Sequence, residues 1–355
     1  MKIAFFAPYP RNTVASQRFR FEQYFSALEK KGITCRHYPF YSRRAFNVLY
    51  RKGYFFKKFA GVMTGFIRRL VQILRSLESD ITFVHREMAP LGPPILEWML
   101  IIFFRKKIIY DFDDALWISD KPSKKGWLRK IRWNKKIAWI CRKSYRISAG
   151  NAYLADFAAR YNPSVIINPT TIDMSGIGNI RSAQNTDVVT IGWTGSHTTL
   201  KYLDAIREPL REILSQYKMT RLVIICNRRP EWELNNMTYV KWKETTEWED
   251  LSRIQIGLMP LPDDPWTRGK CGFKILEYFA VGIPALASPV GINAQLIDNG
   301  KNGFLCEDEN DWVKNLDQLI REPLLRSSMG ETGRKLVEDK FSLNANLETF
   351  LSLFE

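Results

Sequence analysis

The feature that most constrains the fold is a regular alternation of short apolar runs with longer segments of helical pattern. In the first half, the apolar runs are residues 3–8, 33–40, 80–86, 106–117, 144–150 and 164–173. Helical patterns over 16–31, 43–77, 93–104, 127–142 and 151–161 separate them. Alternation of this kind predicts parallel strands joined by crossover helices, which form a doubly wound sheet.

The second half repeats the same rhythm. Its predicted strands are residues 188–195, 221–227, 238–242, 256–261 and 302–306, and its predicted helices include 198–217 and 247–253. A polar stretch over 171–187 separates the halves, and 355 residues with 45% hydrophobic content suffice for two cores. We therefore predict an α/β protein of two doubly wound, Rossmann-like domains, residues 1–175 and 186–340, followed by a helix over 341–355.

Residues 266–288, WTRGKCGFKILEYFAVGIPALAS, combine cations, a glycine turn, an amphipathic helix and a short strand. Free backbone N–H groups and the positive end of the helix dipole meet at such a turn, so it suits an anion. Arg268, Lys270 and Lys274 add positive charge. Glu277 lies one turn after Lys274 on the same face. A nucleoside diphosphate, with phosphates for the cations and ribose for Glu277, fits this pattern; the alternative is an ordinary helix with a charged face.

This segment resembles the donor-binding signature of the family 4 glycosyltransferases, which have the GT-B fold. The matching positions of its Glu-x7-Glu pattern and the turn and strand that follow are Glu277, Tyr278, Ala280, Gly282, Pro284 and residues 285–288. Gly269 stands where the first glutamate usually lies, and Lys274 matches relatives with a lysine three residues before the second.

The resemblance implies that the two domains face a cleft where donor and acceptor meet, with the last helix crossing back to the first domain. It implies a retaining hexosyl- or related glycosyltransferase with a nucleotide-diphosphate sugar as donor and no other cofactor. Bacterial surface polysaccharide or glycan assembly is the expected setting.

The turn over residues 192–198 follows a strand and opens a helix. Gly195 lets backbone N–H groups approach a phosphate, and Ser196 supplies a hydroxyl. In the family that the chain resembles, this turn lies beside the donor diphosphate, so Gly195 and Ser196 join the predicted donor-binding residues.

Residues 111–114 read Asp-Phe-Asp-Asp and contain a D-x-D triplet. Such a triplet holds a divalent metal in another glycosyltransferase fold, and its oxygens suit Mg²⁺ or Mn²⁺. Because the second half already supplies cations for a diphosphate, we predict no metal. Asp113 and Asp114 are instead the predicted catalytic residues, in contact with sugar or acceptor hydroxyls; an aspartate pair that caps a loop is the alternative.

The loop over residues 8–21 has no glycine but offers Ser16, Arg18 and Arg20. Arginine captures phosphate through two hydrogen bonds, so we predict that these residues bind the acceptor, together with His85 at the end of another strand. The alternative is surface charge at the start of a helix.

The formal net charge is +16, and its excess lies mainly in the first half. Residues 43–75 and 121–143 interleave Lys and Arg with aromatic side chains, and 121–143 contain no acidic residue. Such segments suit an anionic membrane surface, although helices that face their own core or nucleic acid are alternatives. A basic nucleic-acid-binding protein on an α/β scaffold is thus the second functional hypothesis. Known nucleic-acid signatures are missing, so we predict no nucleic acid.

The five cysteines are odd in number and scattered, which indicates a reducing compartment. Met1-Lys2 runs directly into a predicted strand rather than a signal peptide, and the apolar run over 95–104 is too short to span a bilayer. We expect a cytoplasmic protein, peripheral at the inner face of the plasma membrane, with a lipid-linked or oligosaccharide acceptor.

Overall fold

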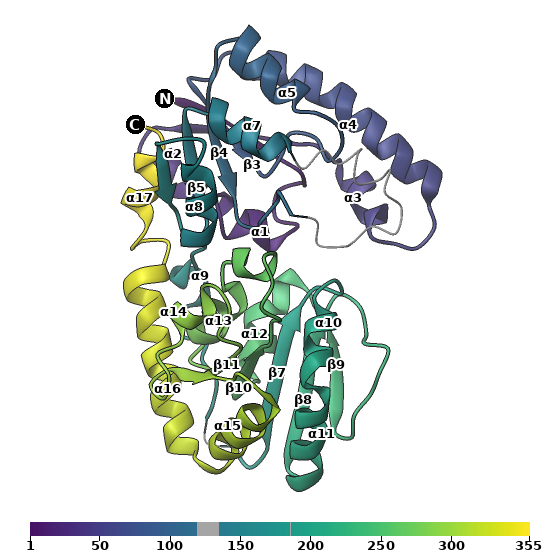
Figure 1. Cartoon of the computed structure of the whole chain (residues 1–355), viewed down its shortest axis with the longest axis vertical. Coiled ribbons are helices and arrows are strands. Elements are labelled where there is room, and N and C mark those ends of the chain that lie inside the picture. Colours follow the sequence, from purple (N-terminus) through teal and green to yellow (C-terminus); the bar gives the residue numbers. More distant parts are fainter. Residues whose placement is uncertain (119–134, 185) are drawn as a thin grey trace. The chain divides into compact units, whose positions relative to one another are not determined.

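The computed structural model describes residues 1–118, 135–184 and 186–355, which divide into two units (Figure 1). Unit 1 comprises Met1–Thr170, Gly269–Cys271 and Asn346–Glu355, and unit 2 comprises Thr171–Arg268 and Gly272–Ala345. Each unit contains a six-stranded sheet whose paired strands are all parallel. The predicted fold class of two Rossmann-like α/β domains is confirmed.

The sheet of unit 1 has the strand order β2-β1-β3-β4-β5-β6. Its strands are β1 (Lys2–Ala7), β2 (Thr34–Pro39), β3 (Ile81–His85), β4 (Lys107–Phe112), β5 (Arg146–Ala149) and β6 (Val165–Ile167). Every residue of β3 is buried, and so is every residue of β1 and β4 after the first, which is why these strands are continuous apolar runs. Later strands are added on one side of β1 up to β2 and on its other side from β3 onward, so the strand order reverses between β1 and β3. In parallel α/β sheets, ligands bind at the carboxyl ends of the two strands that flank such a reversal.

Ten helical segments of unit 1 lie among the described residues. They are α1 (Ala15–Arg18), η1 (Glu22–Tyr24), α2 (Phe25–Lys30), α3 (Arg43–Leu49), α4 (Phe55–Ser76), α5 (Ile95–Trp98), η2 (Met99–Phe103), α7 (Lys136–Lys143), α8 (Ala152–Ala159) and α17 (Leu347–Ser352). In α17, Phe350 stacks on Tyr24 with ring centroids 4.1 Å apart.

Two long helices predicted in unit 1 are interrupted. The segment predicted as one helix over 43–77 forms α3 and α4, because Gly53 and Tyr54 both take positive φ angles, 76° and 57°, which a helix does not accommodate. The segment over 16–31 forms three short helices. For the helix predicted over 127–142, residues 127–134 lie outside the described residues, and the remainder belongs to α7.

The sheet of unit 2 has the order β12-β11-β10-β7-β8-β9 and reverses between β7 and β10. Its strands are β7 (Val189–Gly195), β8 (Thr220–Cys226), β9 (Met237–Lys241), β10 (Ile256–Met259), β11 (Ala285–Ala287) and β12 (Gly303–Leu305). Side chains of its strands, Ile191, Leu222, Ile224 and Leu258 among them, join Leu210 and Leu316 from two helices in one buried cluster.

Twelve helical segments of unit 2 lie among the described residues. They are α9 (Met174–Ile177), α10 (Leu200–Leu203), η3 (Asp204–Ile206), α11 (Arg207–Gln216), η4 (Glu244–Thr246), α12 (Glu247–Ser252), η5 (Thr267–Gly269, whose last residue belongs to unit 1), α13 (Phe273–Ala280), α14 (Asn293–Leu296), α15 (Glu309–Arg321), α16 (Pro323–Leu336) and η6 (Val337–Phe341). The helix predicted over 198–217 is broken at η3, since the ring of Pro209 disfavours a regular turn before it. None of the described helices is both long and apolar enough to cross a membrane.

Candidate functional site

In unit 2, the structure brings Lys274 beside the turn that ends β7. The ammonium of Lys274 lies over the ring of Trp193, with Nζ 5.3 Å from the centroid. A Cβ at Gly195 would lie 2.9 Å from Lys274 Cε and 2.7 Å from the Trp193 ring, so only glycine fits between them. Two predicted donor residues that are far apart in the sequence therefore meet at the carboxyl end of β7.

Side-chain hydrogen bonds hold the turn after β7. Ser196 Oγ lies 2.7 Å from Thr198 Oγ1, and the backbone N–H of His197 donates to Asn227 Oδ1 at 2.8 Å. These contacts fix the backbone that follows Gly195, next to the reversal in strand order between β7 and β10. The turn thus stands where parallel α/β sheets bind their ligands.

Helix α13 carries the two central residues of the predicted donor site. It begins after Gly272, whose φ of 65° is the left-handed conformation that glycine adopts at little cost. Glu277 follows Lys274 by one turn and is 3% exposed. The hydroxyl of Tyr278 accepts from Thr194 N and donates to Leu258 O, both at 3.1 Å, which ties α13 to β7 and β10. The helix is therefore anchored at the reversal itself.

Arg268 lies at an exposed position before this helix. Its guanidinium forms two hydrogen bonds to the carboxylate of Asp263, at 2.6 and 2.8 Å. Gly269, at the place of the family's first glutamate, belongs to unit 1 and packs there against Ala115. A Cβ added at Gly269 would lie 2.8 Å from Ala115 Cβ. A glutamate at position 269 would need Ala115 to move, which explains locally why the chain has glycine there.

In unit 1, Asp111 at the end of β4 is the centre of a fully buried polar cluster. Its carboxylate pairs with the guanidinium of Arg20, lies 2.6 Å from His85 Nδ1 and accepts from Ser148 Oγ at 2.6 Å. Burial disfavours the charge on Asp111, but Arg20 and then His85 outweigh it and lower the pKa of the carboxyl. Arg20 also donates to the carbonyl oxygen of Asn168. Any contact of Arg20 or His85 with an acceptor requires this cluster to open.

Asp113 and Asp114 share a second charged cluster. Arg86 donates to both oxygens of Asp113, at 2.7 and 2.9 Å, and to Asp114 Oδ2 at 2.7 Å. Lys270 Nζ lies 3.5 Å from Asp114 Oδ1. Although burial acts against the charge on Asp113, Arg86 outweighs it and lowers the pKa of that carboxyl. The Asp113 carboxylate is thus held ionised, which suits hydrogen-bond acceptance from hydroxyls rather than proton donation.

The first loop of unit 1 is ordered by two buried side chains. Glu22 accepts from Asn12 N at 2.8 Å and from Gln17 Nε2 at 2.9 Å, and Gln17 bonds both N and O of Tyr9. Ser16 and Arg18, predicted acceptor residues, lie half-buried on α1, and the Arg18 guanidinium lies 4.8 Å from the Phe19 ring centroid.

The sequence did not predict the contacts that Trp193, Arg86 and Ser148 make here, with Lys274, with the Asp113–Asp114 pair and with Asp111 respectively. Trp193 lies within the glycine turn and Arg86 directly follows His85, so the neighbouring motif is the one signal available for them. Among the described residues, no cluster of three or more His, Cys, Asp or Glu side chains is arranged as a metal site. A hollow of about 300 Å³ in unit 2, lined by Asp173, Met174, Glu338 and residues 342–345, contains no predicted site residue.

Part of the chain matches a known protein family. A family model for "Glycosyl transferases group 1" matches residues 188–322, which include the turn after β7 and all of α13. Residues 188–322 therefore match the group 1 glycosyltransferases. The family and GT-B fold that the sequence motifs predicted are thereby confirmed.

The curated relatives match this chain over short stretches. Alpha-1,3/1,6-mannosyltransferase ALG2 of Homo sapiens is 37% identical over 22% of this chain and 19% of its own length. The capsular polysaccharide biosynthesis glycosyltransferase CapM of Staphylococcus aureus is 30% identical over 25% of this chain and 24% of its own length. The chain thus spans about a fifth to a quarter of the length of these relatives.

Solved structures match the whole chain at low identity. Sucrose-phosphate synthase from Thermosynechococcus elongatus has a TM-score of 0.74 at 14% identity, covering 99% of this chain and 98% of its own. HepE of Anabaena, solved in complex with UDP and glucose, has a TM-score of 0.68 at 11% identity with both chains covered completely. At these identities the likeness establishes the fold that this chain shares with them, and nothing of its activity.

Proposed function

We propose that this group 1 glycosyltransferase transfers a hexose or related sugar from a nucleotide-diphosphate sugar to a saccharide acceptor. The observation that carries the proposal is the meeting of Gly195 and Lys274 at the carboxyl end of β7, within the segment that matches the family model. A phosphate-sized anion beside this turn would meet backbone N–H groups and an ammonium together.

The donor-binding roles follow from position on α13 and its flanks. Lys274, with Gly195 and Ser196, faces the diphosphate, and Glu277 accepts from ribose hydroxyls one helical turn away. Arg268 and Lys270 precede the helix and add positive charge near the phosphates. The UDP complex of HepE supports a uridine nucleotide as the first donor to test.

The chemistry needs no metal in this proposal. Negative charge grows on the leaving nucleoside diphosphate in the transition state, and fixed cations with backbone dipoles stabilise it. Asp113 and Asp114, both paired with Arg86, accept hydrogen bonds from sugar or acceptor hydroxyls. Retention of anomeric configuration is proposed from the family, and NMR of an early product distinguishes it from inversion.

For the acceptor we propose a lipid-linked saccharide at the cytoplasmic membrane face, in surface polysaccharide or glycan assembly. The basic, aromatic composition of residues 43–75 supports a peripheral position at an anionic surface, and the capsular polysaccharide role in the name of CapM supports the setting. Ser16, Arg18, Arg20 and His85 are the proposed contacts for its phosphate, and those of Arg20 and His85 require the buried cluster around Asp111 to open.

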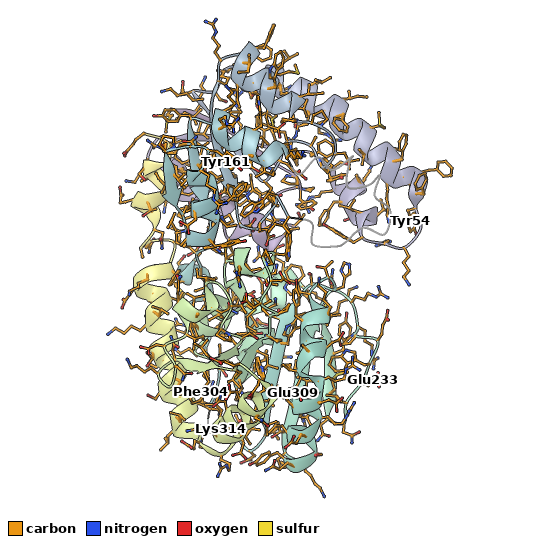
Figure 2. All side chains as sticks on the ribbon, viewed as in Figure 1. Tyr54, Tyr161, Glu233, Phe304, Glu309 and Lys314 are labelled. Atoms are coloured by element: carbon orange, nitrogen blue, oxygen red, sulfur yellow. The ribbon has the colours of Figure 1, made fainter. Side chains whose placement is uncertain are left out.

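A donor screen tests the proposal. Thermal unfolding is followed with UDP-, GDP- and dTDP-sugars, and a ligand at a hundred times its dissociation constant should add about 2.7 kcal/mol of stability. Release of nucleoside diphosphate is then measured for the wild type, for Lys274→Met and for the matched control Lys314→Met, an exposed lysine of the same unit labelled in Figure 2. Loss of release in Lys274→Met alone supports the assignment. Equal release by both variants, or no stabilisation by any nucleotide sugar, contradicts it.

A further inference from the structure

Helix α4 exposes a continuous apolar stripe. Phe56 is 85% exposed, Ile67 64% and Leu74 61%. The exposed large apolar side chains between Phe56 and Leu74 are Phe56, Phe59, Met63, Ile67, Leu70, Val71 and Leu74. At about 100° per residue, these positions fall within an arc of roughly 120° on one side of the helix. Figure 1 shows α4 as a long helix at the outer edge of unit 1, and Figure 2 shows Tyr54 at its N-terminal end.

The buried side of α4 consists of small or polar residues, apart from Ile73. Its buried positions are Gly61, Gly65, Arg69, Gln72, Ile73 and Ser76. A Cβ at Gly65 would lie 2.4 Å from the Phe40 ring, so the helix backbone packs directly on that ring. Arg69 is fully buried and donates to the carbonyl oxygens of Ala7 at 2.6 Å and Met88 at 2.7 Å.

These contacts fix which side of α4 faces outward. Rotating the helix to bury its apolar stripe would break the hydrogen bonds of Arg69 and force a large side chain against Phe40. An amphipathic helix of a water-facing domain normally turns its apolar side inward. Here that arrangement is inverted, and a contiguous apolar patch exposed in this way marks a binding surface.

The charge around the stripe identifies its partner. There is no Asp or Glu between Glu29 and Glu78, whereas Lys and Arg recur through that stretch. Lys57 and Arg75 are exposed on α4, each about 100° from the centre of the stripe. A second copy of the chain would bring the same positive charge to this face, so charge complementarity favours an anionic partner. From Phe56 to Leu74 the stripe runs about 27 Å, a straight convex line that suits a flat surface.

We propose that α4 lies in the interface of an anionic lipid bilayer, with its apolar stripe at the boundary between headgroups and acyl chains. Lys57 and Arg75 then reach lipid phosphates beside it. This role of α4 rests on the proposed function, because binding a bilayer would bring the enzyme to a lipid-linked acceptor. Residues 119–134, which contain much of the other basic segment, lie outside the described residues, so α4 alone carries it.

Vesicle flotation tests the proposal with matched variants. The wild type is compared with a stripe variant (Phe56→Gln, Ile67→Gln, Leu74→Gln) and a control that removes exposed apolar side chains elsewhere (Met219→Gln, Leu324→Gln). Vesicles of phosphatidylcholine with and without phosphatidylglycerol are used. The wild type and the control should float with anionic vesicles, and the stripe variant should bind at least roughly a hundredfold less. Lys57→Gln with Arg75→Gln should weaken binding by about fivefold per residue and reduce its salt dependence.

Two readouts separate binding from folding and from catalysis. Because the stripe side chains are exposed, the stripe variant should keep the thermal unfolding midpoint of the wild type, and it should keep the stabilisation by the nucleotide sugar found in the donor screen. A wild type that fails to float, or a stripe variant that floats equally well, overturns the proposal whether or not the donor screen succeeds. A dimeric wild type that the stripe substitutions convert to a monomer overturns it as well, since a second copy would then cover α4.

Discussion

Replacement of Arg20 by methionine tests how much its buried ion pair with Asp111 stabilises the fold. Arg20 is fully buried and pairs with Asp111, and it also donates to Asn168 O and to Ser148 Oγ at 3.3 Å. Methionine keeps similar length but leaves the Asp111 carboxylate buried without its cation. Removing one partner of a buried ion pair costs about 3–5 kcal/mol. Since His85 and Ser148 still contact the carboxylate, we expect the lower end of that range.

The assay is urea unfolding of the Arg20→Met and Arg18→Met variants. Arg18 is half-buried at the end of α1, two residues before Arg20, and serves as the matched control, with an expected loss below about 1 kcal/mol. Adding Asp111→Asn to Arg20→Met should recover part of the stability, because it removes the unpaired charge. If Arg20→Met unfolds at the urea concentration of the wild type, the pairing with Asp111 does not stabilise the fold, and the reasoning is refuted.

The pH dependence of the same variant has a defined sign. In the wild type the pKa of Asp111 is lowered, so its contribution to stability is present above about pH 3.9, the value of an unperturbed aspartate, and is lost as the pH falls below it. Without Arg20, burial should raise the pKa of Asp111 above that value, so the variant loses stability as the pH rises. The difference in unfolding free energy between wild type and variant should therefore widen from about pH 4 to pH 7.

Three further predictions concern pH, packing and metal. Burial, followed by Arg69, lowers the pKa of His37 to about 3, so stability should fall as the pH drops from about 6.5 towards 3, and His37→Gln should flatten that slope in urea unfolding. Gly272→Ala should lower the free energy of unfolding by about 1–3 kcal/mol, because the φ of Gly272 is 65° and the new Cβ would lie 2.3 Å from Leu296 Cδ1. Gly300→Ala is the control: Gly300 has a φ of 82° and no atom within 4 Å of an added Cβ, so that variant should show only the cost of the backbone conformation. Turnover should survive EDTA, whereas complete loss restored by Mn²⁺ would make Asp111 and Asp113 metal ligands.

Much of the fold was predictable because each buried strand is a continuous apolar run. Residues 3–8 and 80–86 predicted β1 and β3 to within a few residues, since parallel strands covered on both faces have no polar alternation. Helix interruptions were less predictable. Gly53 and Tyr54 break the helical pattern through left-handed backbone, and nothing in the spacing of apolar residues marks the break.

Some residues of the candidate site were predictable from the sequence, whereas the contacts between them were not. Lys274 and Glu277 were predicted from their spacing on one helix, which is local information. The contact of Lys274 with the turn at Gly195, and the pairing of Arg20 with Asp111 across 91 positions, arise from strand order. A single sequence does not encode such distances in a readable pattern.

The sequence also did not show which face of helix α4 is buried. Its apolar periodicity predicts an amphipathic helix, and one hypothesis was that the apolar side faces its own core. That hypothesis is wrong for α4, because Gly65 and Arg69 make the opposite side the buried one. Periodicity gives the two faces of a helix, but the contacts of the buried face determine which one is turned outward.

In the proposed function, α13 and the turn after β7 bind the nucleoside diphosphate of a sugar donor. Isothermal titration of UDP and GDP into the wild type, into Glu277→Gln and into Glu309→Gln tests it most directly, since Glu309 is an exposed glutamate of the same unit. At least one nucleotide should bind the wild type and the Glu309 variant alike. Loss of a charged hydrogen bond of about 1.5–3 kcal/mol should weaken its binding to Glu277→Gln by roughly 10- to 150-fold. Binding of neither nucleotide, or equal affinity for all three proteins, would contradict the account.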